Sequence, residues 1–200
     1  MVVISRSDKK SVEIFSGLKE KSTVTTANIM FNGGVIHILD TVLTMPLSPS
    51  DSAIDSQLTA LAGGLTSTNL VSAVDNLKDV TIFAPSNKAF QDIGSVVSSL
   101  SMMQLANILE YHVINGTVGY SSLLSTGLAN ESFPSLTGQR LNVEAVDNKV
   151  FVNSAQVTIT DIIVSNGVMH VLDKYVSRSL LPYPSIVSFL SMKRYNVNKL

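Results

Sequence analysis

Apolar positions change their spacing part-way along the chain, from intervals of three and four residues to strict alternation. Over residues 53–77 they recur at helical intervals, and Gly63-Gly64 separates two predicted helices. A further helix is predicted over residues 102–111. Beyond Val113 the period falls to two, and the segments rich in Val and Ile predict strands at 140–146, 149–152, 157–164 and 168–176. Helices followed by a strand meander indicate an α+β fold with antiparallel sheets.

Turn and capping residues refine this pattern. Residues 80–83 predict a short strand, followed by a helix that Ser86 or Asn87 can cap. Two pairs, Asp147-Asn148 and Asn166-Gly167, predict two-residue hairpin turns, because Asn and Gly tolerate positive φ.

An internal repeat organises the chain. The string Gly-Val-x-His-x-Leu-Asp at residues 34–40 recurs 133 residues later at 167–173. The first copy lacks the helices and strands that precede the second copy. The predicted organisation is therefore a C-terminal remnant of an upstream domain at 1–45, a proline- and serine-containing linker at 46–52, a complete domain at 53–180 and a C-terminal extension at 181–200.

Three blocks, in this order, carry a family resemblance. Residues 81–90, 109–113 and 166–173 resemble the signature segments of the fasciclin (FAS1) family, and the phrasing is most similar to fungal members. The resemblance implies a FAS1-like wedge of two antiparallel β-sheets with a helical lobe along one edge. It also implies a non-catalytic adhesion or cell-wall module, secreted or cell-surface associated, that contacts a cell-surface or matrix protein or glycan.

The resemblance also implies candidate contact residues. Asp161 and Ile162 match a segment to which integrin contact is assigned in animal members, although Ile159 and Thr160 depart from that pattern. The pair Tyr111 and His112 matches residues implicated in adhesion within the family. From the residues alone, His112 ends an amphipathic helix and is interpreted as buried.

Composition and charge exclude several classes of function. The 14 basic and 15 acidic residues give a net charge of −1, and no basic cluster offers a nucleic-acid surface. The absence of cysteine excludes disulfides and thiolate metal sites. The chain has neither a nucleophile elbow nor a phosphate-binding loop, and its three histidines lie among apolar neighbours. The expectation is a protein with no catalytic residues, metal or cofactor.

The expected setting is extracellular. No apolar run is long enough to span a membrane, and the first residues lack the layout of a signal peptide. If the parent protein is secreted, the chain is therefore expected to be a fragment or a truncated product of it. Asn115 and Asn130 each begin an N-glycosylation acceptor pattern.

Two further hypotheses remain open. As an alternative to adhesion, the resemblance implies a carrier of lipid or carotenoid, because some fasciclin domains are similar to proteins that bind these ligands. The cleft between the helices and the sheets would hold the ligand, with Met102, Met103 and Met169 as candidate lining residues. The strands within residues 12–45 have no sheet of their own, so they are expected to pack on the complete domain or to self-associate with another copy.

Overall fold

Two β-sheets and a helical lobe appear in the computed structural model, which describes residues 4–7 and 12–176. The predicted extension at 181–200 lies outside the described residues. The first sheet is formed, in this order, by β1 (Ile4–Ser7), β2 (Val12–Phe15), β3 (Lys21–Phe31) and β4 (Gly34–Leu39). A 3-10 helix, η1 (Gly17–Lys19), joins β2 to β3.

The second sheet has seven strands, which lie between residues 80 and 172. Its order is β6 (Val113–Ile114), β5 (Val80–Pro85), β11 (Gly167–Leu172), β10 (Ala155–Val164), β9 (Lys149–Val152), β8 (Arg140–Val146) and β7 (Glu131–Pro134). An isolated bridge from Ile114 to Ser135 joins the two ends of this order, so the sheet bends around its own core. Together with the helices, this arrangement confirms the α+β class.

One strand pair departs from the antiparallel expectation. β5 runs parallel to β11, with Val80 opposite Gly167 and Pro85 opposite Leu172, while β5 pairs antiparallel with β6. Alternation of apolar residues marks a strand but carries no information on its direction. The long connection between β5 and β11 permits the parallel arrangement.

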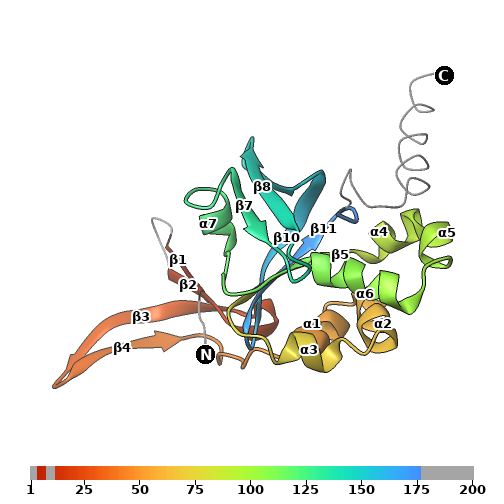
Figure 1. Ribbon diagram of the computed structural model, residues 1–200. Helices are drawn as coiled ribbons and strands as arrows, with labels where there is room; N and C mark the ends of the chain where they lie inside the picture. Colours follow the sequence, from red (N-terminus) through yellow and green to blue (C-terminus); the bar gives the residue numbers. More distant parts are fainter. Residues whose placement is uncertain (1–3, 8–11, 177–200) are drawn as a thin grey trace, which may run out of the picture.

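The helical lobe packs along one side of this sheet (Figure 1). It consists of α1 (Pro49–Asp55), α2 (Thr59–Ser67), α3 (Val71–Asp75), α4 (Asn87–Asp92), α5 (Gly94–Val97) and α6 (Met102–Tyr111). A short helix α7 (Ser121–Leu124) lies apart from the lobe, between β6 and β7 in the chain. No helix among the described residues is long and apolar enough to cross a membrane.

The predicted linker at 46–52 is shorter than expected, because α1 begins within it. Ser48 is the N-cap, and its hydroxyl accepts a hydrogen bond from the Asp51 N–H at 3.2 Å. Pro49 occupies the first turn, where its missing N–H removes no helical hydrogen bond. Proline here starts a helix, although it was predicted to break regular structure.

Two hydrophobic cores lie on the two sides of the central strands. The first joins the helical lobe to β5, β10 and β11, and includes Leu61, Leu109 and Met169. The second fills the bend of the sheet and includes the fully buried Phe83 and Leu141. Burying each side chain of this size contributes about 2 kcal/mol to the free energy of unfolding. The apolar interior therefore stabilises the domain without disulfide bonds, since the chain has no cysteine.

The two predicted turns have different outcomes. Asp147 and Asn148 have φ of 49° and 61°, which confirms a two-residue turn with both residues left-handed. The other turn is Ser165-Asn166, one residue earlier than predicted, and Gly167 is already the first residue of β11. Glycine is needed there for another reason, since a Cβ on Gly167 would lie 2.0 Å from the Val80 carbonyl oxygen.

The N-terminal hairpin β3–β4 projects away from the helical lobe and the second sheet (Figure 1). At its base, η1 packs on β10, and the Lys19 Nζ donates to the Thr160 carbonyl oxygen at 2.6 Å. The Ser165 N–H donates to the Leu47 carbonyl oxygen at 2.7 Å, which joins the linker to the β10–β11 turn. η1 therefore packs on the second sheet while the hairpin itself extends outward.

Candidate functional site

Asp161 lies at an irregularity in the pairing of β10 with β11, between the pairs of Ile159 and Ile162. Its backbone is left-handed, with φ of 58°, and its N–H donates to the Nδ1 of His170 at 3.2 Å. One carboxylate oxygen accepts from the Ser121 N–H at 2.8 Å, and the other accepts from the Ser121 hydroxyl. The carboxylate is therefore fixed in direction while it stays partly exposed.

The residues around Asp161 form a mixed polar and apolar surface. Ile159 keeps 45 % of its surface exposed, although it is a large apolar residue. Burial, and then the charge of Asp161, raise the pKa of the neighbouring Tyr120 hydroxyl. The term "Asp161 surface" is used below for the set Lys19, Tyr120, Ser121, Ile159, Thr160 and Asp161. Lys19 and Ser121 were not predicted, because their contacts span 141 and 40 residues of sequence.

The other three predicted contact residues are buried. Ile162, Tyr111 and His112 are 4 %, 5 % and 2 % exposed. The Tyr111 hydroxyl donates to the Arg140 carbonyl oxygen and accepts from the Asn153 amide, both at 3.0 Å. In this fold these three side chains are held inside the domain, so they do not share an exposed surface with Asp161.

The two buried histidines are neutral and carry their protons on different nitrogens. His112 Nε2 accepts from the Val176 N–H at 3.0 Å, so Nδ1 carries the proton and donates to the Ile108 carbonyl oxygen at 2.7 Å. His170 Nδ1 accepts from Asp161, so Nε2 donates to the Gly119 carbonyl oxygen at 2.8 Å. Burial lowers the pKa of His112 to about 4 and also lowers the pKa of His170.

Comparison with known proteins decides the family. The model of the fasciclin domain family matches residues 56–178. This chain belongs to the fasciclin domain family. The fasciclin family is one of non-catalytic adhesion-type modules, so the chain is assigned no enzymatic activity.

Several relatives share more than the fasciclin domain with this chain. A fasciclin-like arabinogalactan protein of the fungus Arthroderma benhamiae is 36 % identical over 172 residues, which are 86 % of this chain and 40 % of that protein. The fasciclin-like arabinogalactan protein CTB11 of Cercospora beticola is 30 % identical over 159 residues, 79 % of this chain and 42 % of that protein. Transforming growth factor-beta-induced protein ig-h3 of Sus scrofa is 32 % identical over 146 residues, 70 % of this chain and 21 % of that protein. This fasciclin chain therefore spans less than half the length of each of these three relatives.

A solved structure supports the fold. The FAS1 domain pair from the insect cell adhesion molecule fasciclin I superposes with a TM-score of 0.59 at 18 % identity, covering 88 % of this chain and 67 % of that chain. The match confirms the FAS1-like α+β architecture.

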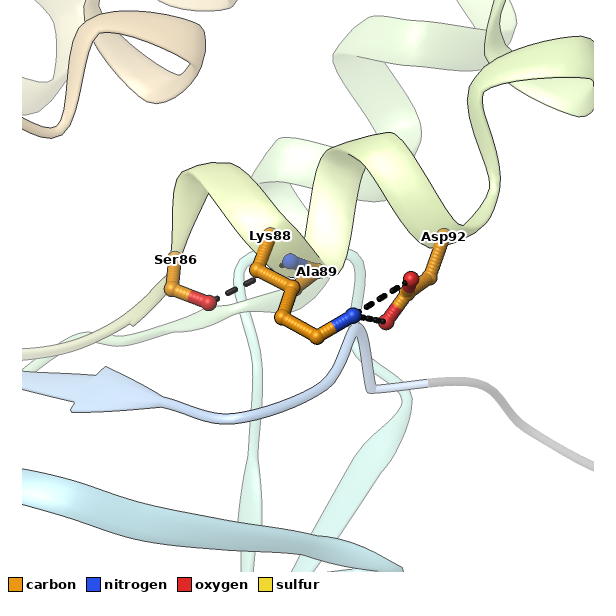
Figure 2. Close-up of polar contacts among 4 residues, drawn as sticks. All are labelled: Ser86, Lys88, Ala89 and Asp92. Carbon is orange, nitrogen blue, oxygen red and sulfur yellow. Dashed lines mark hydrogen bonds and ion pairs between the residues drawn. The ribbon is translucent and has the colours of Figure 1, made fainter.

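The first signature block of this fasciclin domain has a structural role. At the start of α4 the Ser86 hydroxyl accepts from the Ala89 N–H at 3.2 Å, as predicted, and Lys88 pairs with Asp92 at 2.8 Å (Figure 2). Asn87 connects two helices, since its Oδ1 accepts from the Ala60 N–H at 3.0 Å. α2 has no side-chain cap of its own, so Asn87 supplies that cap from α4.

The proposed carrier cleft has a poor counterpart in the structure. A cavity of about 20 Å³ lies under the helical lobe, lined by residues that include Leu65, Phe83 and Met169. This volume holds about one water molecule, whereas ligand pockets reach several hundred Å³. Met102 and Met103 are 62 % and 77 % exposed on α6 and do not line that cavity, so the three methionines do not form one site.

Two remaining features bear on chemistry and modification. Within the described ranges, no group of three or more His, Asp or Glu side chains converges as metal ligands would. Asn115 follows β6 and Asn130 precedes β7, and both residues are exposed outside regular secondary structure. The two acceptor asparagines are thus accessible to a glycosylating enzyme in the folded domain.

Proposed function

We propose that this fasciclin chain is an extracellular or cell-wall adhesion module that contacts a cell-surface or matrix protein or glycan through the Asp161 surface. The observation that carries the proposal is the fixed, partly exposed carboxylate of Asp161 beside the exposed Ile159. Of the four candidate contact residues, Asp161 alone keeps an accessible side chain. Family membership supports an adhesion-type role, and fasciclin I, whose FAS1 domain pair has a similar fold, is an insect cell adhesion molecule.

The geometry suits recognition of a polar partner. A carboxylate offers about four acceptor positions, and Ser121 occupies two of them. The remaining positions are available to a hydroxyl, an amide or a cation. Because Ser121 and His170 already fix the conformation, binding would cost little ordering entropy. The exposed face of Ile159 adds apolar contact area next to the charged group.

Adhesion of protein-coated beads to cells or wall material tests the proposal. Asp161→Asn removes the charge and keeps a side chain that tolerates positive φ, and Ile159→Thr removes the apolar contact. Each change is expected to weaken adhesion about tenfold, the effect of losing roughly 1.4 kcal/mol. Ile54→Thr on α1 is the matched control, because Ile54 is also an exposed isoleucine but lies on the helical lobe.

The outcomes separate the module from the site. Wild-type beads that do not adhere to any tested surface would contradict the adhesion function. Wild-type adhesion that both Asp161→Asn and Ile159→Thr retain in full would place the contact elsewhere on the domain. Loss in these two variants together with normal adhesion of Ile54→Thr is the expected result.

A further inference from the structure

The hairpin β3–β4 reproduces β10–β11 in detail. Every paired residue of the first hairpin has its counterpart 133 positions later, and both hairpins break register at the same two steps. The supporting hydrogen bonds are also repeated. Thr25 Oγ1 donates to the Ile38 carbonyl oxygen at 3.2 Å, and Thr158 Oγ1 donates to that of Val171 at 3.1 Å. The β3–β4 hairpin thus has the same register and the same irregularities as β10–β11, which lies inside the fasciclin domain.

The surroundings of the β3–β4 hairpin differ completely from those of β10–β11. β11 lies between β10 and β5, whereas in the described part of the chain β4 ends its sheet and pairs with β3 alone. Four apolar residues of the hairpin are between 39 and 54 % exposed, and their counterparts, which pack under the helical lobe, are at most 4 % exposed. The four are Ile29, Phe31, Ile36 and Ile38. A soluble protein seldom leaves such a row of large apolar side chains uncovered.

Gly34 indicates which kind of element fits beside β4. Its counterpart Gly167 has to be glycine because a Cβ would lie 2.0 Å from the Val80 carbonyl oxygen on β5. At Gly34 a Cβ would meet nothing closer than the ring of Phe31 at 3.2 Å, and no positive φ requires glycine there. The glycine has a steric reason only when a parallel strand lies against β4 as β5 lies against β11.

His37 gives a second indication. Its Nδ1 accepts from the Asn28 N–H at 3.3 Å, as His170 accepts from Asp161. The other nitrogen of His170 donates to Gly119 in the loop that follows β6. No partner for Nε2 of His37 is found among the described residues, so this N–H is oriented by the hairpin and left available to an equivalent carbonyl.

We infer that the β3–β4 hairpin docks the front half of another fasciclin unit. The occupant is a segment of the type of residues 49–118. Its strand would run parallel to β4, its helices would cover Ile29 and Ile36, and the loop after it would place a carbonyl on His37. The strand β5 of a second copy of this chain does not fit the role, because it is already paired on both sides, with β6 and β11. The 172 residues shared with the Arthroderma relative are more than remain after residue 55, so that relative matches part of this N-terminal region as well.

A tandem polypeptide tests the inference. A second copy of residues 47–146 is placed directly before Ile14, the position equivalent to residue 147, so that the added front half precedes the hairpin. Hydrogen exchange of the β4 amides is compared between this tandem and the full chain. In the tandem, exchange over residues 34–39 is expected to slow at least about a hundredfold, because edge amides become ladder amides.

Oxidation of Met30 by peroxide is expected to slow in the tandem as well, since Met30 is 75 % exposed in this chain and its counterpart Ile163 is 0 % exposed. The exposed Met103 and the buried Met169 serve as internal references.

Gly34→Ala supplies the control. In the full chain this change is expected to leave the melting temperature nearly unchanged, while in the tandem it removes the protection of β4. Unprotected β4 amides in the tandem would overturn the inference, and so would equal protection in the tandem carrying Gly34→Ala. A full chain that light scattering shows to be a dimer with protected β4 amides would also overturn it, because the edge would then belong to a second copy.

Discussion

Asn28 and Asp161 hold the same left-handed bulge in two copies of one hairpin. Their φ angles are 60° and 58°, and each N–H donates to the Nδ1 of the histidine nine residues later, at 3.3 and 3.2 Å. Asn and Asp are the residues that most readily adopt this conformation apart from glycine. The bulge is therefore a property of the hairpin, and the negative charge belongs to the complete domain's copy alone.

This relationship predicts the effect of substitutions at Asp161. Asp161→Asn should fold with nearly the wild-type free energy of unfolding, because Asn28 shows that the amide side chain suits the bulge. Asp161→Val should cost about 1–3 kcal/mol, since a β-branched residue is strained at positive φ and loses both contacts to Ser121. Urea unfolding of both variants measures the difference, and equal stability of the two would contradict the assigned strain.

Stability should fall between about pH 6.5 and pH 4. His112 has a pKa of about 4 in the folded protein against 6.5 when exposed, so the unfolded chain binds more protons in this interval. The neutral, buried His112 contributes about 3 kcal/mol to the free energy of unfolding. This contribution is complete above pH 6.5 and is lost as the pH falls to about 4. His170 acts in the same direction. Urea unfolding at a series of pH values tests this, with His112→Phe expected to give a shallower dependence. A flat profile from pH 6.5 to 5 would count against the neutral, buried state.

The two equivalent glycines should respond very differently to one added methyl group. Gly167→Ala forces β5 and β11 apart and is expected to cost more than about 3 kcal/mol, or to prevent folding. Gly34→Ala should cost less than about 1 kcal/mol, because only the rotatable ring of Phe31 is close. Thermal melts of the two variants of the full chain provide the measurement, and similar losses would show that the close approach at Gly167 is relaxed in solution.

Asn87 should matter more to stability than its neighbour Lys88. Asn87→Ala removes the bond to the Ala60 N–H and the 2.8 Å bond to the Gln57 carbonyl oxygen, and is expected to cost about 1–2 kcal/mol. Lys88→Ala removes an exposed ion pair with Asp92 and is expected to cost less than about 0.5 kcal/mol. Chemical denaturation ranks the two, and the reverse order would remove the capping role given to Asn87.

Glycosylation tests whether the two acceptor asparagines are accessible in the folded domain. Asn115 and Asn130 are exposed outside regular structure, so secretion from a eukaryotic host should attach a glycan to each. Intact-mass measurement before and after enzymatic deglycosylation should show two sites, with Asn115→Gln and Asn130→Gln each removing one. Bare asparagines in secreted protein would contradict the accessibility inferred for these loops.

Local patterns predicted the parts of the fold that depend on local chemistry. The helix over 102–111 was predicted from its apolar spacing with the observed bounds. The structure adds a capping box formed by Ser101 and Gln104 at its start. The parallel pairing of β5 with β11 was not predicted. Strand direction depends on how a long connection crosses the domain, and no short sequence window contains that information.

In the candidate site, too, local features were predicted and long-range contacts were not. The sequence placed Asp161 within a predicted strand but gave no sign of Ser121 or Lys19, whose contacts depend on tertiary structure. Tyr111 and Ile162 were predicted as contact residues from resemblance, and burial shows them to be core residues. Gly167 was assigned to a turn because glycine commonly serves turns, whereas the approach of a distant strand is what requires it.

The junction between the hairpin and the domain has a mechanical consequence. The backbone of residues 44–47 is held from both sides. The Gly17 N–H donates to the Thr44 carbonyl oxygen at 3.2 Å, and the Ser165 N–H donates to that of Leu47 at 2.7 Å. A force on the projecting hairpin would therefore reach the β10–β11 turn through main-chain hydrogen bonds, with no slack segment between the two.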